Sequence, residues 1–190
     1  MKCDVIIAGV GGQGVLSVAA IIARAAVKEN LTVRQSEVHG MAQRGGAVLA
    51  HLRIADKPIA SDLVPRGNAD LILSMEPMES LRYAAWLSPG GALVSAAEPV
   101  VNIPNYPEMD KIMDAIKKFP VSRIVEAAAL AKEAGLARSV NIAMVGAASA
   151  FLPIGSEALE DTIKKTFAQK DNATVEANIK AFRLGRDAAK

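Results

Sequence analysis

The stretch Val5-Ile6-Ile7-Ala8-Gly9-Val10-Gly11-Gly12-Gln13-Gly14 decides the fold of this chain. A short apolar, β-branched run meets a Gly-x-Gly-x-x-Gly pattern, and an apolar-periodic segment follows at 15–27. This order predicts a strand, a tight turn and a helix start, the setting that a dinucleotide-binding fingerprint requires. The free N–H groups of the first helical turn commonly face an anion. The candidates for ligand or phosphate contact are therefore Gly9, Gly11, Gly12, Gln13 and Gly14, and a purely structural turn is the alternative.

Length and composition restrict the class of protein. The chain has 190 residues, 51% of them hydrophobic and only 4% aromatic, which suits one domain with an aliphatic core. Its 22 basic and 20 acidic residues give a net charge of +2, which offers no electrostatic case for binding nucleic acid. The single cysteine, Cys3, excludes an internal disulfide and an iron–sulfur cluster held by this chain alone. The two histidines and the scattered carboxylates form no zinc pattern, so we expect no metal site in this chain.

No secretory or membrane segment is visible in the sequence. The N-terminus runs directly into the first predicted strand, without a charged region and a removable apolar stretch. The longest apolar run, at 15–27, is interrupted by Ser17 and Arg24 and predicts a buried helix rather than a membrane span. We therefore expect a cytoplasmic protein with no membrane contact.

Strand and helix patterns alternate along the first half of the chain, and the second half is mostly helical. Apolar runs predict strands at 3–10, 32–38, 47–54, 68–74, 92–95, 100–103 and 121–126, with a short hairpin around the turn signal at 56–58. Helices are predicted at 14–28, 77–86, 106–118, 127–134, 141–152, 156–168 and 174–189. Such alternation predicts an α/β, Rossmann-like, open and mostly parallel sheet with helices on both faces. We expect one domain, 1–190, with an α/β part at about 1–126 and a helical part at about 127–190.

A second glycine-rich loop follows the predicted strand at 32–38. It lies in the segment Ser36-Glu37-Val38-His39-Gly40-Met41-Ala42-Gln43-Arg44-Gly45-Gly46. Glu37 has about the spacing from the first glycines that a ribose-binding carboxylate has in dinucleotide folds. His39 and Arg44 add a titratable group and a cation suited to phosphate or carboxylate. We therefore add Glu37, His39, Arg44, Gly45 and Gly46 to the candidates, and an internal structural role for Glu37 and His39 is the alternative.

Together the two loops carry a family resemblance. The segments at 9–14, 36–46, 51–54, 70–77 and 141–147 resemble the gamma-type domain of 2-oxoacid:ferredoxin oxidoreductases, and most closely the small subunit of the indolepyruvate type. The similarity spans nearly the whole chain. The pairing of Gly-Gly-Gln-Gly at 11–14 with Gln-Arg-Gly-Gly at 43–46 is far more specific than either loop alone.

The resemblance implies a partner that performs the chemistry. In that family a larger subunit carries thiamine diphosphate with magnesium and the iron–sulfur clusters, decarboxylates an aryl 2-oxoacid and passes electrons to ferredoxin, and coenzyme A captures the acyl group. This chain would then cover the active site or help to hold coenzyme A, with His39 and Arg44 as candidates for a site shared with the partner. We expect it to be inactive alone. Two alternatives stay open, namely a free-standing NAD(P)-binding oxidoreductase and a non-enzymatic interaction module.

Overall fold

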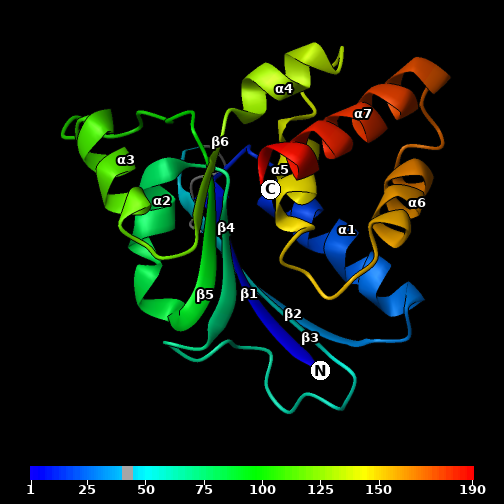
Figure 1. The fold of residues 1–190 in the computed structure, drawn as a ribbon, viewed down its shortest axis with the longest axis horizontal. Coiled ribbons are helices and arrows are strands. Elements are labelled where there is room, and N and C mark those ends of the chain that lie inside the picture. The colour runs from blue at the N-terminus through cyan, green and yellow to red at the C-terminus, as the bar shows by residue number, and fades with distance from the viewer. Residues whose placement is uncertain (40–44) are drawn as a thin grey trace.

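A six-stranded sheet lies between two layers of helices (Figure 1). The computed structural model describes residues 1–39 and 45–190. The strands are β1 (Lys2–Val10), β2 (Thr32–His39), β3 (Ala47–Ala55), β4 (Ala69–Ser74), β5 (Leu87–Ala96) and β6 (Ser122–Val125). The helices are α1 (Val15–Lys28), α2 (Pro77–Arg82), the 3-10 turn η1 (Ala84–Trp86), α3 (Met109–Lys117), α4 (Ala127–Glu133), α5 (Val140–Ala148), α6 (Ser156–Thr166) and α7 (Asn172–Ala188).

The sheet has the order β2-β3-β1-β4-β5-β6 and is mixed, with one reversed strand. β1, β4, β5 and β6 are parallel neighbours, whereas β3 runs antiparallel to both β1 and β2. The predicted mostly parallel α/β fold is confirmed. Because β1 and β2 run in the same direction, their carboxyl ends lie at the same edge of the sheet, where ligands bind in open α/β folds.

Alternating side chains divide the core between the two faces. On β1, which is buried from Cys3 onward, Val5 and Ile7 belong to the larger cluster with α1, α5, α6 and α7, whereas Ile6 points to the smaller cluster with α3. This period of two is the normal consequence of strand geometry. The predicted alternation of the strand at 47–54 is confirmed, since Val48, Ala50, Leu52 and Ile54 all face the larger cluster.

Helices α5 and α7 cross in close backbone contact within the larger cluster. A Cβ atom on Gly146 of α5 would lie 1.9 Å from the carbonyl oxygen of Phe182, and one on Gly185 of α7 would lie 1.9 Å from that of Ala143. Each glycine therefore admits the backbone of the other helix. This crossing fixes the helical layer that covers α1's side of the sheet (Figure 1).

Three sequence predictions of local structure are wrong. No hairpin forms around 56–58, because β3 already pairs with β1 on one side and β2 on the other, and Asp56 instead binds the N-terminal amine at 2.6 Å. Residues 100–103 form no strand, since the N–H of Val100 bonds Glu76 and the side chain of Asn102 bonds Gly45. The strand predicted at 92–95 begins earlier, at Leu87, so that the glycines at 90–91 lie within β5. The register with β4 shifts there, and a Cβ on Gly91 would lie 2.6 Å from the Ala69 carbonyl oxygen.

Candidate functional site

The loop between β1 and α1 has backbone conformations that favour glycine. Gly12 has φ +102° and Gly14 has φ +81°, the left-handed region that side chains rarely adopt. Gly14 is the N-cap of α1, with no side-chain cap and no acidic residue in the first turn. The first N–H groups of a helix have no partner within the helix, and its dipole makes this end positive. The positive N-terminal end of α1 therefore favours an anionic group beside this loop.

Gln13 fastens this loop to the sheet rather than projecting freely from it. Its Oε1 accepts from the N–H of Val10 at 2.9 Å, and its Nε2 donates to the carbonyl oxygen of Met75 at 2.9 Å. The side chain thus joins the carboxyl ends of β1 and β4. Gly9 makes room for it, since a Cβ there would lie 2.9 Å from Oε1 of Gln13 and 2.9 Å from Val15.

The second glycine loop docks directly on the first. The N–H of Gly11 donates to the carbonyl oxygen of Gly46 at 2.8 Å, and the N–H of Gly45 donates to that of Gly11 at 3.3 Å. Asn102, in the segment after β5, donates its Nδ2 to the carbonyl oxygen of Gly45 at 2.5 Å. Three separate segments of the chain therefore meet at one edge of the sheet.

Some predicted site residues lie outside what the structure describes. Arg44 falls among residues 40–44, and only the backbone of His39 is described, paired with Val48 at the end of β2. Glu37 is exposed on β2 opposite Ala50, with β3 between it and β1. Two strand spacings amount to about 10 Å, so Glu37 does not sit beside the glycine loop as the ribose-binding carboxylate does in dinucleotide folds. The structure brings Gly9, Gly11, Gln13, Gly45 and Gly46 together and leaves Glu37 apart.

A buried carboxylate holds the segments around the site in place. Glu76 follows β4, is 1% exposed and caps α2 by accepting from the N–H of Glu79 at 2.8 Å. Its other oxygen accepts from the N–H of Val100 and from the hydroxyl of Tyr106. Burial and the contact with Glu76 raise the pKa of Tyr106 well above its usual value, which keeps the phenol protonated. Glu76 is therefore a structural carboxylate that starts a helix.

The described residues contain no group of His, Cys, Asp and Glu side chains placed to hold a metal ion. Burial raises the pKa of the Cys3 thiol to about 12, with Asp70 and Asp4 adding to the rise. The thiol therefore stays protonated at neutral pH. A single cysteine also cannot supply the four thiolates that usually hold an iron–sulfur cluster. Within residues 1–39 and 45–190, no helix is long and apolar enough to cross a membrane.

Comparison with known proteins shows the family to which this chain belongs. Residues 4–188 match the family described as pyruvate ferredoxin/flavodoxin oxidoreductase. This chain belongs to that family. It is 36% identical to the indolepyruvate oxidoreductase subunit IorB of Archaeoglobus fulgidus, over 100% of this chain and 96% of the relative. It is 34% identical to the subunit of the same name from Methanothermobacter thermautotrophicus, over 100% of this chain and 98% of the relative. It is 30% identical to the pyruvate/ketoisovalerate oxidoreductases common subunit gamma of Thermococcus kodakarensis, over 91% and 89% of the two chains.

Solved structures of the family have the same fold. The gamma subunit of a keto/oxoacid ferredoxin oxidoreductase from Geobacter sulfurreducens superimposes with a TM-score of 0.71 at 26% identity, over 98% of both chains. The 2-oxoglutarate:ferredoxin oxidoreductase of Magnetococcus marinus superimposes with a TM-score of 0.79 at 21% identity, over 99% of this chain but 31% of that chain. The fold thus occurs in ferredoxin oxidoreductases both as a separate subunit and as about a third of a longer chain.

Sequence reasoning did not find three polar residues that shape the site. Asn102 and Tyr106 act through contacts that join segments distant in sequence, which no local pattern reveals. Asn141 is the second residue of α5, and its Nδ2 lies 3.0 Å from where a Cβ of Gly14 would be, so it borders the first glycine loop. It falls within the segment at 141–147 that carries the family resemblance, which was the available signal.

Proposed function

We propose that this chain is the small subunit of an indolepyruvate:ferredoxin oxidoreductase, a complex that oxidatively decarboxylates an aryl 2-oxoacid. The observation that carries the proposal is the full-length similarity to four archaeal subunits named indolepyruvate oxidoreductase subunit IorB, at 34–36% identity. Subunits named for 2-oxoglutarate synthase share only 29–30% identity with it. The aryl substrate class is therefore favoured over a short dicarboxylic 2-oxoacid.

In this proposal the edge with the two glycine loops faces the large subunit. Four of the seven exposed large apolar side chains among the described residues, namely Leu16, Val38, Val101 and Ile103, belong to segments at this edge. Exposed apolar side chains gathered around loops are typical of a protein interface. The positive end of α1 at Gly14 then meets anionic groups of the substrates or of the partner.

The partner carries the thiamine diphosphate, magnesium and iron–sulfur clusters in this proposal, and electrons leave to ferredoxin. The cysteine count supports this assignment, because the chain has one cysteine and iron–sulfur clusters are usually held by four thiolates. Coenzyme A is the acyl acceptor, and its phosphates are candidates for contact with the glycine loops and with Arg44. A solved relative from Magnetococcus marinus has coenzyme A and succinyl-CoA bound.

Reconstitution tests the proposal. The purified chain alone is expected to show no indolepyruvate-dependent reduction of ferredoxin or a viologen dye, and addition of the large subunit is expected to restore it. Turnover of 2-oxoglutarate or pyruvate in place of indolepyruvate would overturn the substrate assignment. Turnover by the chain alone would overturn its role as the subunit without cofactors.

Arg44 provides a residue-level test of the shared site. Arg44→Ala is expected to lower kcat/KM of the complex about tenfold to a hundredfold, since a charged hydrogen bond contributes roughly 1.5–3 kcal/mol. The matched control is Arg34→Ala, which removes an exposed arginine near the other end of β2 whose partner, Asp62, is 3.7 Å away. If Arg44→Ala is as active as Arg34→Ala, Arg44 has no role at the shared site. If its melting temperature falls together with its activity, the role of Arg44 is structural.

A further inference from the structure

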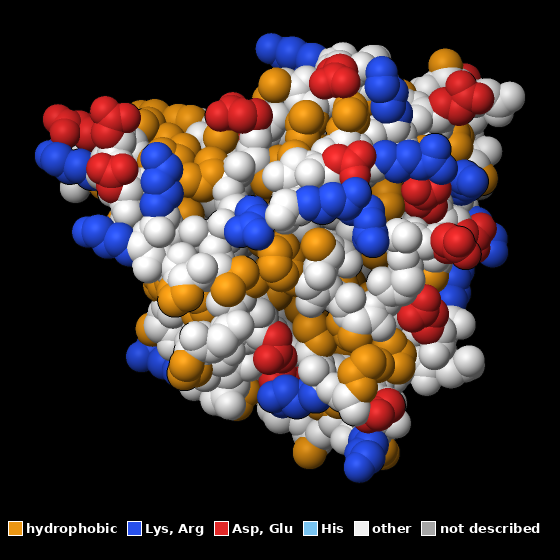
Figure 2. Space-filling model, viewed as in Figure 1, with side chains coloured by type: hydrophobic (Ala, Val, Ile, Leu, Met, Phe, Trp, Pro, Cys, Tyr) orange, Lys and Arg blue, Asp and Glu red, His pale blue; other side chains and the backbone are white. Residues whose placement is uncertain are grey.

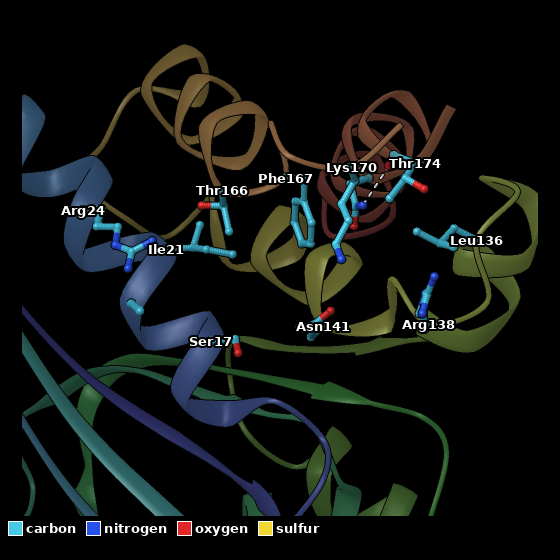
Figure 3. Close-up of a pocket in the computed structure, with 12 residues that line it drawn as sticks. Ser17, Ile21, Arg24, Leu136, Arg138, Asn141, Thr166, Phe167, Lys170 and Thr174 are labelled. Atoms are coloured by element: carbon cyan, nitrogen blue, oxygen red, sulfur yellow. Dashed lines mark hydrogen bonds between the residues drawn. The ribbon is translucent and has the colours of Figure 1, made fainter. Parts of the chain in front are cut away.

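A cavity of about 470 Å³ lies within the helical layer, beside α1 rather than in the glycine loops (Figure 3). Ile21 and Arg24 line it from α1, and Leu136 and Arg138 from the connection between α4 and α5. Phe167 and Lys170 reach into it from the connection between α6 and α7 (Figure 3). Its size is within the range of small-molecule sites, about 300–1,000 Å³.

Three cations line this cavity without a carboxylate partner. Arg24, Arg138 and Lys170 form no ion pair within residues 1–39 and 45–190, and no acidic residue lines the cavity. Elsewhere on the helical layer positive and negative side chains are interspersed (Figure 2). By contrast, Lys28 of α1 and Lys165 of α6 both form ion pairs with Asp161. Three cations on the wall of one cavity create a positive field that an anion would relieve.

The rest of the cavity wall combines a flat ring with aliphatic and amide groups. Phe167 is partly buried against the core, and Ile21 and Leu136 add aliphatic surface. Asn178 is 1% exposed and reaches the carbonyl oxygen of Thr174 through its Nδ2 at 2.8 Å. A ring stacked on Phe167 and polar edges near the amide groups would fit a heteroaromatic base.

Asp171 is the N-cap of α7 and directly follows the cavity residue Lys170, but its oxygens are already used. They accept from the N–H of Thr174 at 2.8 Å and from its hydroxyl at 2.9 Å, which caps α7. These hydrogen bonds lower the pKa of Asp171, and the charge of Arg138 adds to the effect. The carboxylate therefore stays ionised as a cap, and the cations of the cavity must hold a ligand anion in spite of its negative charge.

We propose that this cavity binds a nucleotide, with its phosphates held by Arg138 and Lys170 and its base against Phe167, while Arg24 at the other end of the cavity adds to the positive field (Figure 3). Planar guanidinium groups and a lysine are the usual partners of phosphate oxygens in proteins. The adenosine diphosphate unit is the probe of choice, because it occurs both in free nucleotides and in coenzyme A. The inference does not rest on the proposed function, since a chain that fails to restore indolepyruvate turnover can still bind ADP.

Calorimetric titration of the full chain with ADP and with inorganic pyrophosphate tests the proposal. We expect one ADP per chain, bound about tenfold more tightly than pyrophosphate, which lacks the base. The double variant Arg138→Gln/Lys170→Gln is expected to weaken ADP binding about tenfold or more. Lys111→Gln/Lys117→Gln removes the same two charges from α3, beyond the other face of the sheet, and is expected to leave the Kd within about twofold.

Phe167→Leu tests the ring, because leucine preserves apolar packing and removes the flat surface. It is expected to reduce the preference for ADP over pyrophosphate without changing pyrophosphate affinity. Titration of coenzyme A into the ADP-saturated chain identifies the source: competition assigns the cavity to the nucleotide end of coenzyme A, and independent binding assigns it to a free nucleotide. The proposal is overturned by no heat at millimolar ADP, by equal weakening in the two double variants, or by an unchanged preference in Phe167→Leu.

Discussion

Two groups of glycines occupy this molecule for opposite reasons. At the crossing of α5 and α7, Gly146 and Gly185 have ordinary helical backbones, and their missing side chains are replaced by the backbone of the other helix at 1.9 Å. In the loop after β1, Gly12 has φ +102° and nothing within 4 Å of where its Cβ would be. At the helix crossing, glycine is required because there is no room for a side chain. At Gly12, glycine is required by the positive φ, although the space beside it is open.

The difference separates a contact that is filled within the chain from a surface that is open to a ligand or partner. The helix crossing is filled from within, so a change there alters folding whatever the chain binds. The glycine loop has its polar groups fixed by Gln13 and Gly46 but leaves space above Gly12. A change there is expected to affect assembly and activity more than folding.

Gly146→Ala is expected to cost about 3 kcal/mol of the free energy of unfolding, or to prevent folding, because overpacking a close helix contact forces the backbones apart. The new methyl group would meet the carbonyl oxygen of Phe182 at 1.9 Å and the backbone nitrogen of Arg186 at 2.9 Å. Gly90→Ala is the control, since a Cβ there has nothing within 4 Å and its φ is not positive. Urea denaturation measures the stability of both variants. Equal midpoints would contradict the view that the crossing of α5 and α7 has no room for a side chain.

Gln13→Ala is expected to cost about 2 kcal/mol, because it removes two hydrogen bonds and leaves the N–H of Val10 and the carbonyl oxygen of Met75 without their partner. Gln35→Ala, an exposed change on β2, is the control and is expected to stay within about 0.5 kcal/mol. Thermal denaturation compares them. A Gln13 variant as stable as the control would show that the side chain serves the partner and not the loop.

The sequence predicted the layers because the causes are local. The β-branched run at 3–10, the glycine turn and the alternation at 47–54 each determine an element through backbone preference and side-chain period. The insertion of β3 between β1 and β2 was not predictable in this way, because it depends on which strands pair at long range. The same pairing made the expected hairpin around 56–58 wrong, since both edges of β3 were already occupied.

The sequence predicted the glycines of the candidate site but not the polar residues that hold its loops in place. Gly11 and Gly46 were singled out separately by their loops, and the structure joins them at 2.8 Å. Asn102 and Tyr106 escaped notice because each acts across a gap of at least 30 residues on a loop without a motif. Glu37 had a suitable spacing from the glycines in sequence, yet an intervening strand separates it from them in space.

Gly12→Ala separates backbone strain from function. It is expected to cost about 1–2 kcal/mol, the penalty for a side chain in the left-handed region. Gly67→Ala is the matched control, because Gly67 has φ +74°, nothing within 4 Å of a Cβ, and a position before β4 at the opposite edge of the sheet. The two variants are expected to melt alike, whereas only Gly12→Ala lowers turnover of the reconstituted complex. Equal activities would mean that the space above Gly12 is unused.

Asn102→Ala is expected to have the smallest effect, about 0.5–1 kcal/mol, because one exposed hydrogen bond contributes little in water. The bond nevertheless ties the segment after β5 to Gly45, so its loss should loosen the second loop against the first. Asn68→Ala removes a similar exposed bond, from Nδ2 to the carbonyl oxygen of Arg66 at 3.0 Å, and serves as the control. Hydrogen exchange at the N–H of Gly11, which bonds Gly46, should become faster in Asn102→Ala and stay unchanged in Asn68→Ala. If both variants leave that exchange unchanged, the two loops hold each other without Asn102, and this edge of the sheet is as complete by itself as the helix crossing.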